Sequence, residues 1–222
     1  MLSSPDQPAE NFVKYKVIVF DFDGTFADSF PFFVTGFNRA AAKYSFQSLS
    51  KENTDQLRNL GARELIRRLN IPFWKVPLVG YLVKKQLTSS ASEIKLFPGV
   101  SDLILGLREK GVRVAILTSN IEENVRTILG EDLSSRIDCY QCNVGVFSKK
   151  KALSKMLRRN GWLKTDVLMV GDEVRDAEAA RECGVDFCAV SWGYNSAPTL
   201  EPLSVWKPLQ SFEQLLLQNA AS

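Results

Sequence analysis

Four short apolar runs, rich in β-branched residues, limit most strongly what this chain can fold into. They are Val17–Phe20, Val114–Leu117, Val167–Val170 and Val185–Val190. Each is apolar along nearly its whole length, which is typical of strands buried on both faces of a parallel sheet. Segments with helical spacing lie between them, at 101–110, 120–129, 150–160 and 174–183. This alternation predicts an α/β fold with a Rossmann-like, doubly wound parallel sheet.

Residues 31–97 break this alternation. Helical spacing continues through 32–46 and 54–69 without a strand run, and Phe97-Pro-Gly-Val100 closes the segment. We therefore predict a small α-helical cap domain at 31–97, inserted into a discontinuous core domain at 1–30 and 98–222. Residues 1–12 are expected to form a polar tail.

The part of the insertion from 71 to 87 is strongly apolar and contains Phe73, Trp74 and Tyr81. We expect these side chains to form the core of the cap. The alternative is a patch that faces a partner or a membrane surface.

Polar residues follow the predicted strands at the points where the strands end. Asp21 and Asp23 follow the first strand, Thr118-Ser119-Asn120 follow the second, and Asp172 follows 167–170. Taken alone, such carboxylates, including Asp176 four residues after Asp172, are also typical of residues that cap helices. Because the carboxyl ends of parallel strands share one edge of the sheet, we expect these side chains to converge there, together with Lys149.

This set of residues suits phosphoryl transfer. Carboxylate oxygens favour Mg²⁺, which in turn favours phosphate as a further ligand, and a lysine neutralises negative charge on the phosphoryl group. The chain contains no histidine. Ser-His-Asp catalysis, Cys-His catalysis, phosphohistidine chemistry and zinc sites with histidine ligands are therefore excluded.

The same residues carry a family resemblance. Asp-Phe-Asp-Gly-Thr at 21–25, Leu-Thr-Ser-Asn at 117–120, Lys149 and Gly-Asp-x-x-x-Asp at 171–176 resemble, in order, the four motifs of the haloacid dehalogenase-like hydrolase superfamily. The resemblance is to the phosphoglycolate-phosphatase-like branch of this superfamily, and it also covers Phe97-Pro-Gly-Val100 and Ser191-Trp-Gly-Tyr194.

The resemblance implies a role for each residue. Asp21 would attack phosphorus and become an aspartyl-phosphate, and Asp23 would protonate the leaving group and then activate water. Thr118, Ser119, Asn120 and Lys149 would bind the phosphoryl oxygens. The magnesium site would comprise Asp21, the main-chain carbonyl of Asp23, Asp172 and Asp176.

Two assignments depend on less regular features. The third motif reads Ser148-Lys-Lys-Lys151, so Lys150 is an alternative to Lys149. The turn Leu60-Gly-Ala-Arg-Glu64 resembles a cap loop that reaches the substrate, which makes Arg63 a candidate substrate-binding residue. The alternative is a surface arginine on a helix.

We therefore predict a magnesium-dependent phosphatase acting on a small phosphate monoester such as phosphoglycolate. The alternatives are a phosphomutase with the same chemistry and a non-catalytic module that binds phosphate. A haloacid dehalogenase would not need Asp23 or Asp172, and a phosphonate hydrolase would need a cap lysine where the turn has Arg63.

Other features bear on the cysteines, the location in the cell and the partners of the protein. Cysteines 139, 142, 183 and 188 are expected to be buried free thiols; a zinc site with four thiolates is the alternative. With no secretory signal and no apolar run near about 18 residues, we expect a cytoplasmic monomer or homodimer that contacts no membrane. The basic stretch at 149–164 is expected to be mostly a solvated helix face rather than a nucleic-acid site.

Overall fold

The computed structural model describes residues 13–220, so the predicted tail at 1–12 lies outside the described residues. Its centre is a sheet of five parallel strands in the order β3-β2-β1-β4-β5. The strands are β1 (Val17–Phe20), β2 (Arg113–Leu117), β3 (Cys139–Gln141), β4 (Val167–Gly171) and β5 (Asp186–Ala189). The predicted Rossmann-like α/β fold is confirmed.

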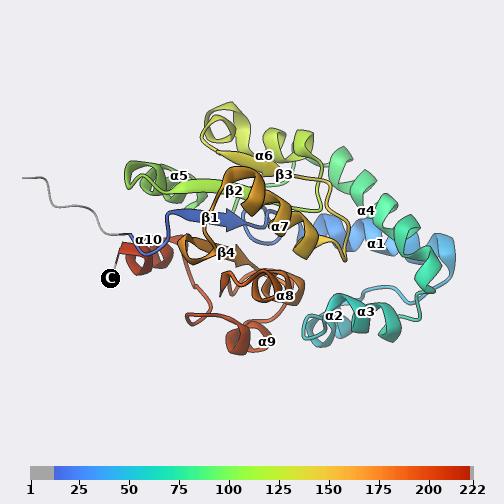
Figure 1. The fold of residues 1–222 in the computed structure, drawn as a ribbon. Coiled ribbons are helices and arrows are strands. Elements are labelled where there is room, and N and C mark those ends of the chain that lie inside the picture. Colours follow the sequence, from blue (N-terminus) through green and yellow to red (C-terminus); the bar gives the residue numbers. More distant parts are fainter. Residues whose placement is uncertain (1–12, 221–222) are drawn as a thin grey trace, which may run out of the picture.

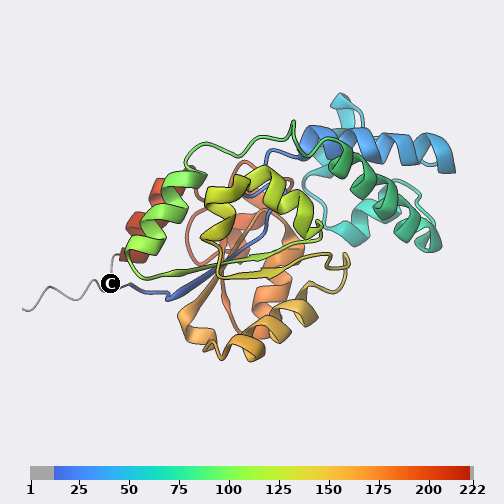
Figure 2. The same cartoon turned by 90° about the horizontal axis from the view of Figure 1, so that it is seen from above.

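Helices cover both faces of the sheet (Figures 1 and 2). Ile18 and Phe20 of β1 face one layer, and Val17 and Val19 face the other. Each fully buried aliphatic or aromatic side chain stabilises the fold by about 1.5–3 kcal/mol. The first layer contains α5 (Val100–Glu109), α6 (Glu122–Ser135) and α10 (Phe212–Ala220); the second contains α7 (Lys149–Asn160), α8 (Val174–Cys183) and the short α9 (Ala197–Leu200).

The chain leaves and re-enters this core at two adjacent points. Ala27 and Leu96 form an antiparallel bridge, the Asp28 N–H donates to the Lys95 carbonyl (2.9 Å), and the Phe97 N–H donates to the Phe26 carbonyl (2.8 Å). Both ends of the inserted segment are thus fixed side by side, beyond the carboxyl end of β1.

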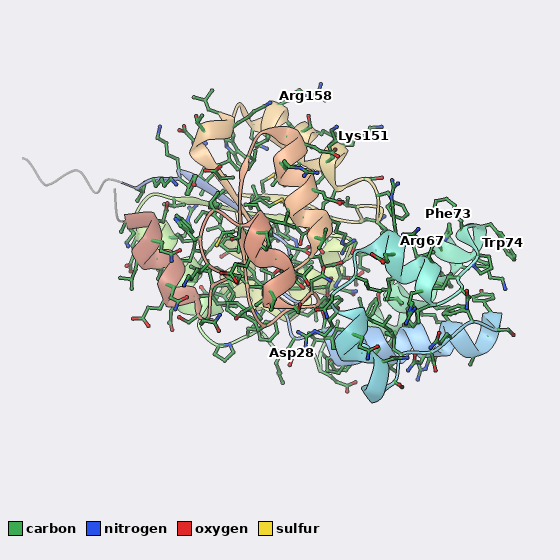
Figure 3. The ribbon with its side chains drawn as sticks, turned by 90° about the horizontal axis from the view of Figure 1, so that it is seen from below. Asp28, Arg67, Phe73, Trp74, Lys151 and Arg158 are labelled. Carbon is green, nitrogen blue, oxygen red and sulfur yellow. The ribbon has the colours of Figure 1, made fainter. Side chains whose placement is uncertain are left out.

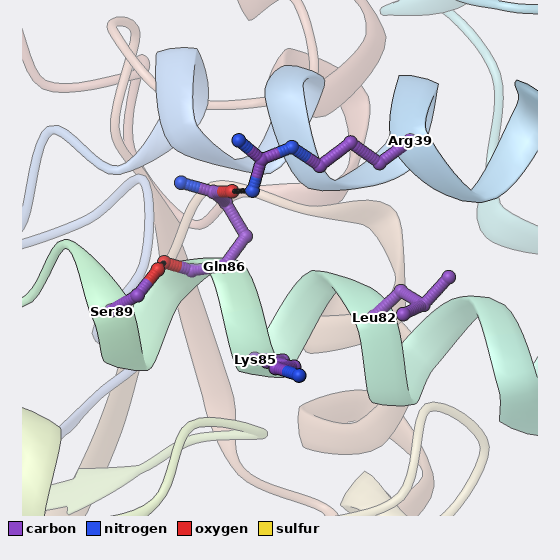
Figure 4. A pocket seen from close by; sticks show the side chains of 5 residues that line it. All are labelled: Arg39, Leu82, Lys85, Gln86 and Ser89. Carbon is purple, nitrogen blue, oxygen red and sulfur yellow. Dashed lines mark hydrogen bonds between the residues drawn. The ribbon is translucent and has the colours of Figure 1, made fainter.

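Four helices lie between these two points, and we call them the cap helices. They are α1 (Phe30–Tyr44), α2 (Lys51–Leu57), α3 (Ala62–Arg68) and α4 (Val76–Ser89). Figure 1 shows α1 and α4 packed along each other, with α2 and α3 apart from this pair. Gly36 permits the close approach, since a Cβ there would lie 3.0 Å from the Val83 Cα. Arg39 donates to Gln86 across the same pair (Figure 4).

The single helix expected at 54–69 is interrupted. α2 ends at Leu57 and α3 begins at Ala62, because Gly61 is extended (φ −71°, ψ 161°) and the core holds the intervening turn. The Asn195 side chain donates to the carbonyls of Arg58 (2.7 Å) and Leu60 (3.0 Å).

The expectation for the apolar segment at 71–87 is right for four of its aliphatic residues, Ile71, Val79, Val83 and Leu87, and wrong for its aromatic ones. Val79 and Val83 are buried, but Phe73, Trp74 and Tyr81 are 72%, 70% and 64% exposed. Phe73 and Trp74 form a turn of 3₁₀ helix at the outer end of the cap helices (Figure 3).

The basic stretch forms a solvated helix face as expected, and Lys151 and Arg158 point outward from α7 (Figure 3). Within residues 13–220, no helix combines the length and apolar character that crossing a membrane requires.

Candidate active site

Three carboxylates meet at the carboxyl edge of the sheet. Asp21 follows β1, Asp172 follows β4, and Asp176 lies in the first turn of α8. One oxygen of each lies within 4.8 Å of the other two, and all three side chains are buried. The pairing of β1 with β4 explains the approach, since the Asp21 N–H continues the ladder by donating to the Val170 carbonyl (2.9 Å).

Lys149 is the cation inside this cluster. It is the first residue of α7 and only 3% exposed, with Nζ 2.8 Å from Asp21 Oδ2 and in an ion pair with Asp176 Oδ1. Burial opposes its charge, but Asp176 and Asp21 outweigh that effect and raise the Lys149 pKa. Lys150 instead points outward and pairs with Glu182. The geometry thus favours Lys149 over Lys150.

Asp172 is held by residues on both sides. Its Oδ1 accepts a hydrogen bond from Thr25 Oγ1 (2.7 Å) and its Oδ2 accepts one from the Tyr194 N–H (2.7 Å). Thr25 thus orients Asp172 and caps no helix, since α1 begins only at Phe30. Two glycines allow this close wrapping, because a Cβ at Gly24 or at Gly193 would lie 2.9 Å or 2.5 Å from Asp172 Cγ.

Asp23 lies beside this cluster and is not one of its three carboxylates. Asn120 Nδ2 donates to Asp23 Oδ1 (3.2 Å), and the Asn120 N–H donates to Thr118 Oγ1 (3.1 Å). Burial, and then the charge of Asp21, raise the Asp23 pKa to about 6. A carboxyl with this pKa exchanges a proton readily near neutral pH.

The cluster carries more negative charge than Lys149 offsets. Burial, followed by the charge of Asp21, raises the Asp172 pKa well above its usual value. Burial also raises the Asp176 pKa to about 6, although Lys149 acts in the opposite direction. Asp176 additionally accepts the Glu173 N–H (3.1 Å), so the helix-capping interpretation of this residue is also correct.

These residues fit a divalent cation. Both side-chain oxygens of Asp21 are buried; among the described residues, Oδ2 has only the Lys149 ammonium beside it, at 2.8 Å, and Oδ1 has no hydrogen-bond partner. Buried polar atoms normally have a partner, and three buried carboxylates are the hard oxygen ligands that Mg²⁺ prefers. Asp21 and Asp172, supported by Asp176, are the side chains that would hold it.

A cavity of about 710 Å³ opens onto Asp23. The residues that line it from the sheet side include Ser119, Asn120 and Tyr194. The cap helices supply most of the remaining wall. Three cations line it: Arg58, Lys84 and Arg175. Arg58 donates from Nε to the Tyr194 carbonyl (3.1 Å) and from Nη2 to the Gly193 carbonyl (2.5 Å). It therefore connects the cap helices to the loop that holds Asp172.

Arg63 does not line this cavity. Its side chain is exposed, and its guanidinium carbon lies 5.4 Å from the centre of the Phe147 ring. Its substrate role stays a prediction, and Arg58 is the cap arginine that reaches the cavity.

The four cysteines are free thiols, as expected. Cys183 and Cys188 are buried, but Cys139 and Cys142 are only half-buried because β3 is an edge strand. Within residues 13–220, the aspartate cluster is the only set of carboxylates or thiolates close enough together to hold a metal ion. The four-thiolate zinc site therefore has no support among these residues.

A model of the family described as haloacid dehalogenase-like hydrolase matches residues 18–190. The chain belongs to this family. The match begins within β1 and ends just after β5, so it includes every side chain of the aspartate cluster and Lys149.

Similar proteins place this hydrolase in the phosphoglycolate-phosphatase-like branch. It is 36% identical over 186 residues to a phosphoglycolate phosphatase of Synechococcus elongatus, covering 83% of this chain and 88% of that one. It is 28% identical to phosphoglycolate phosphatase 1 of Pseudomonas aeruginosa, covering 83% and 75%. A haloacid dehalogenase-like hydrolase of Streptococcus pneumoniae shares the fold, with a TM-score of 0.75 at 16% identity over 92% and 98% of the two chains. The prediction of a phosphatase-type hydrolase is confirmed.

Proposed function

We propose that this haloacid dehalogenase-like hydrolase is a magnesium-dependent phosphatase that cleaves a phosphate monoester through an aspartyl-phosphate at Asp21. The main support for the proposal is the environment of the Asp21 carboxylate. It is 1% exposed, faces Lys149 Nζ at 2.8 Å, and lies against Asp172 and Asp176. A carboxylate with one unpartnered oxygen, held beside a lysine and a candidate metal site, suits a nucleophile for phosphorus.

Each neighbouring residue has a matching role in the proposed reaction. Asp21 attacks phosphorus while Asp23 gives its proton to the leaving oxygen. Asp23 then accepts a proton from water as that water attacks the aspartyl-phosphate, which releases phosphate and restores Asp21. Lys149, Thr118 and the groups at Ser119 and Asn120 would hold the phosphoryl oxygens.

A bound Mg²⁺ would neutralise charge on Asp21 and on the phosphoryl oxygens. Asp21, Asp172 and the Asp23 carbonyl would hold it, with Asp176 in support. Asp172 is oriented for this by Thr25 and by the Tyr194 N–H, which engage both of its oxygens from outside the cluster.

We also propose that residues 31–97 form a cap domain, mounted at the paired segments near Ala27 and Leu96 on a core of 1–30 and 98–222. The names of the relatives make 2-phosphoglycolate the first small metabolite to test.

The test is phosphate release from a panel of monoesters, each assayed with Mg²⁺ and with chelator. We expect release that requires Mg²⁺ and is lost in Asp21→Asn. Asp28→Asn is a matched control, because Asp28 is exposed and its backbone alone contacts Lys95. Release that persists in Asp21→Asn contradicts the mechanism. Return of the phosphoryl group to a second alcohol without net release would indicate the mutase, and binding without either reaction would indicate the non-catalytic module.

A further inference from the structure

We propose that the enzyme acts on phosphate monoesters of apolar alcohols, with the apolar chain or ring bound between the cap helices. This substrate class rests on the proposed phosphatase function, and it goes beyond the small polar ester expected from the sequence.

The cavity has the size and position that such a substrate needs. The cavity of about 710 Å³ includes Asp23, the proposed proton donor to the leaving group, in its lining. Protein sites for organic ligands usually measure about 300–1,000 Å³ and bury most of the ligand. A two-carbon leaving group would leave most of this space unused, whereas a longer chain would extend from Asp23 into it.

The walls of the cavity are mainly apolar. The helix pair α1–α4 and the helices α2 and α3 present apolar side chains to the same space. These include Leu57, Leu65, Ile66, Ile71, Val79 and Val83. Displacing water from such walls favours binding by about 25 cal/mol per Å² of apolar surface.

Two of the three exposed aromatic residues of the cap belong to the same cavity. Phe73 and Tyr81 line it, and the Phe73 ring stacks on the Phe147 ring with centres 6.1 Å apart. Closer to the reaction centre, Phe30 and Phe33 surround the Tyr194 ring at 5.1 Å and 5.2 Å. Aromatic surface thus occurs both near Asp23 and at the outer end of the cap.

Each of the three lining cations already has a hydrogen-bond or ion-pair partner. Arg175 pairs with Glu173, and the Lys84 Nζ donates to Asn143 Oδ1 (2.7 Å) while burial lowers its pKa. Arg58 donates to two backbone carbonyls. Among the described residues, Arg175 Nε is buried without a hydrogen-bond partner. A carboxylate on the leaving group would have to compete with existing partners for the bonded donors, and the structure describes no further cation in the lining.

The test compares linear alkyl phosphates from methyl to hexyl with 2-phosphoglycolate, in the presence of Mg²⁺. We expect kcat/KM to rise roughly two- to fourfold for each added methylene, the value of burying one CH₂ group. A flat or falling series, or a preference for 2-phosphoglycolate over hexyl phosphate, overturns the substrate class while leaving the phosphatase function in place.

Gly80 allows the cavity to be filled without disturbing a packed neighbour. It lies in α4 and lines the cavity, and a Cβ there would have no described atom within 4 Å. In Gly80→Phe, we expect the ratio of kcat/KM for hexyl over methyl phosphate to fall at least about tenfold. Gly80→Ala should lower the ratio less, because it fills less space. Equal ratios in wild type and Gly80→Phe contradict the proposal.

If no ester is hydrolysed, the proposed phosphatase function is wrong. A binding experiment then tests separately whether the cavity takes an apolar chain. Calorimetry with hexyl phosphate should give a negative heat-capacity change, the mark of apolar burial, that shrinks in Gly80→Phe. Hexyl phosphate binding no more tightly than inorganic phosphate overturns the inference.

Discussion

Replacing Gly24 with alanine should displace Asp172 and so destroy activity as well as reduce stability. Gly24 has φ +81°, a left-handed conformation that costs an alanine about 1–2 kcal/mol. The new Cβ would also lie 2.6 Å from Tyr194 Cδ1 and 2.9 Å from Asp172 Cγ. Relieving such overpacking typically costs about 1–3 kcal/mol, so the two effects total about 2–5 kcal/mol.

Two further glycines separate these effects. Gly111 also has a positive φ (+72°), but a Cβ there meets no described atom within 4 Å, so Gly111→Ala introduces strain alone. Gly193 is not in the left-handed region, but its Cβ would lie 2.5 Å from Asp172 Cγ, so Gly193→Ala introduces the clash alone.

Thermal denaturation and kcat distinguish the three variants. In a protein of this size, 1 kcal/mol corresponds to a Tm change of about 2–4 °C, so we expect losses of about 2–8 °C for Gly111→Ala and about 4–20 °C for Gly24→Ala. Gly24→Ala and Gly193→Ala should lower kcat at least about 100-fold, because a small misplacement of a positioned group is that costly, whereas Gly111→Ala should keep kcat. Wild-type kcat in Gly24→Ala would refute the view that these glycines position Asp172.

Three other predictions concern Arg58, the metal and a thiol. Arg58→Ala should weaken Mg²⁺ binding about tenfold, because Arg58 holds the loop that orients the metal ligand Asp172. Arg58→Lys should not restore Mg²⁺ binding, because one ammonium cannot reach both carbonyls that Arg58 contacts. Titrating activity with Mg²⁺ measures both effects. Mg²⁺ at a hundredfold excess over its Kd should stabilise the wild type by about 2.7 kcal/mol, and Asp172→Asn should abolish this gain in thermal denaturation. Because burial raises the Cys142 pKa to about 12, its alkylation by iodoacetamide should be slow at pH 8 and accelerate as pH rises toward that value; rapid alkylation at pH 8 would contradict this.

The sheet and the ends of its strands were predictable because their signals are local. Val17–Phe20 and Asp21 are contiguous in sequence, so the strand and the carboxylate that follows it are found together. The choice between Lys149 and Lys150 was not predictable, because it depends on where α7 begins and on the direction of each side chain within its first turn.

The connections between the cap helices and the core were missed for a related reason. The bonds from Asn195 to the carbonyls of Arg58 and Leu60 join residues 137 and 135 positions apart, which no local pattern marks. Arg63 is predicted from the resemblance of the turn at 60–64 to a cap loop, and no local pattern marks Arg58. The break after Leu57 brings Arg58 to the cavity and leaves Arg63 outside it.

The most direct test of the account is to trap the phosphorylated enzyme. The protein is mixed with a phosphate monoester and Mg²⁺, quenched in acid, reduced with borohydride and digested, so that an aspartyl-phosphate is read as homoserine at its position. The account predicts homoserine at position 21, none with chelator, and none in Asp21→Asn. Turnover without any label at position 21, or a label on another residue, would contradict the assignment of Asp21 as the nucleophile.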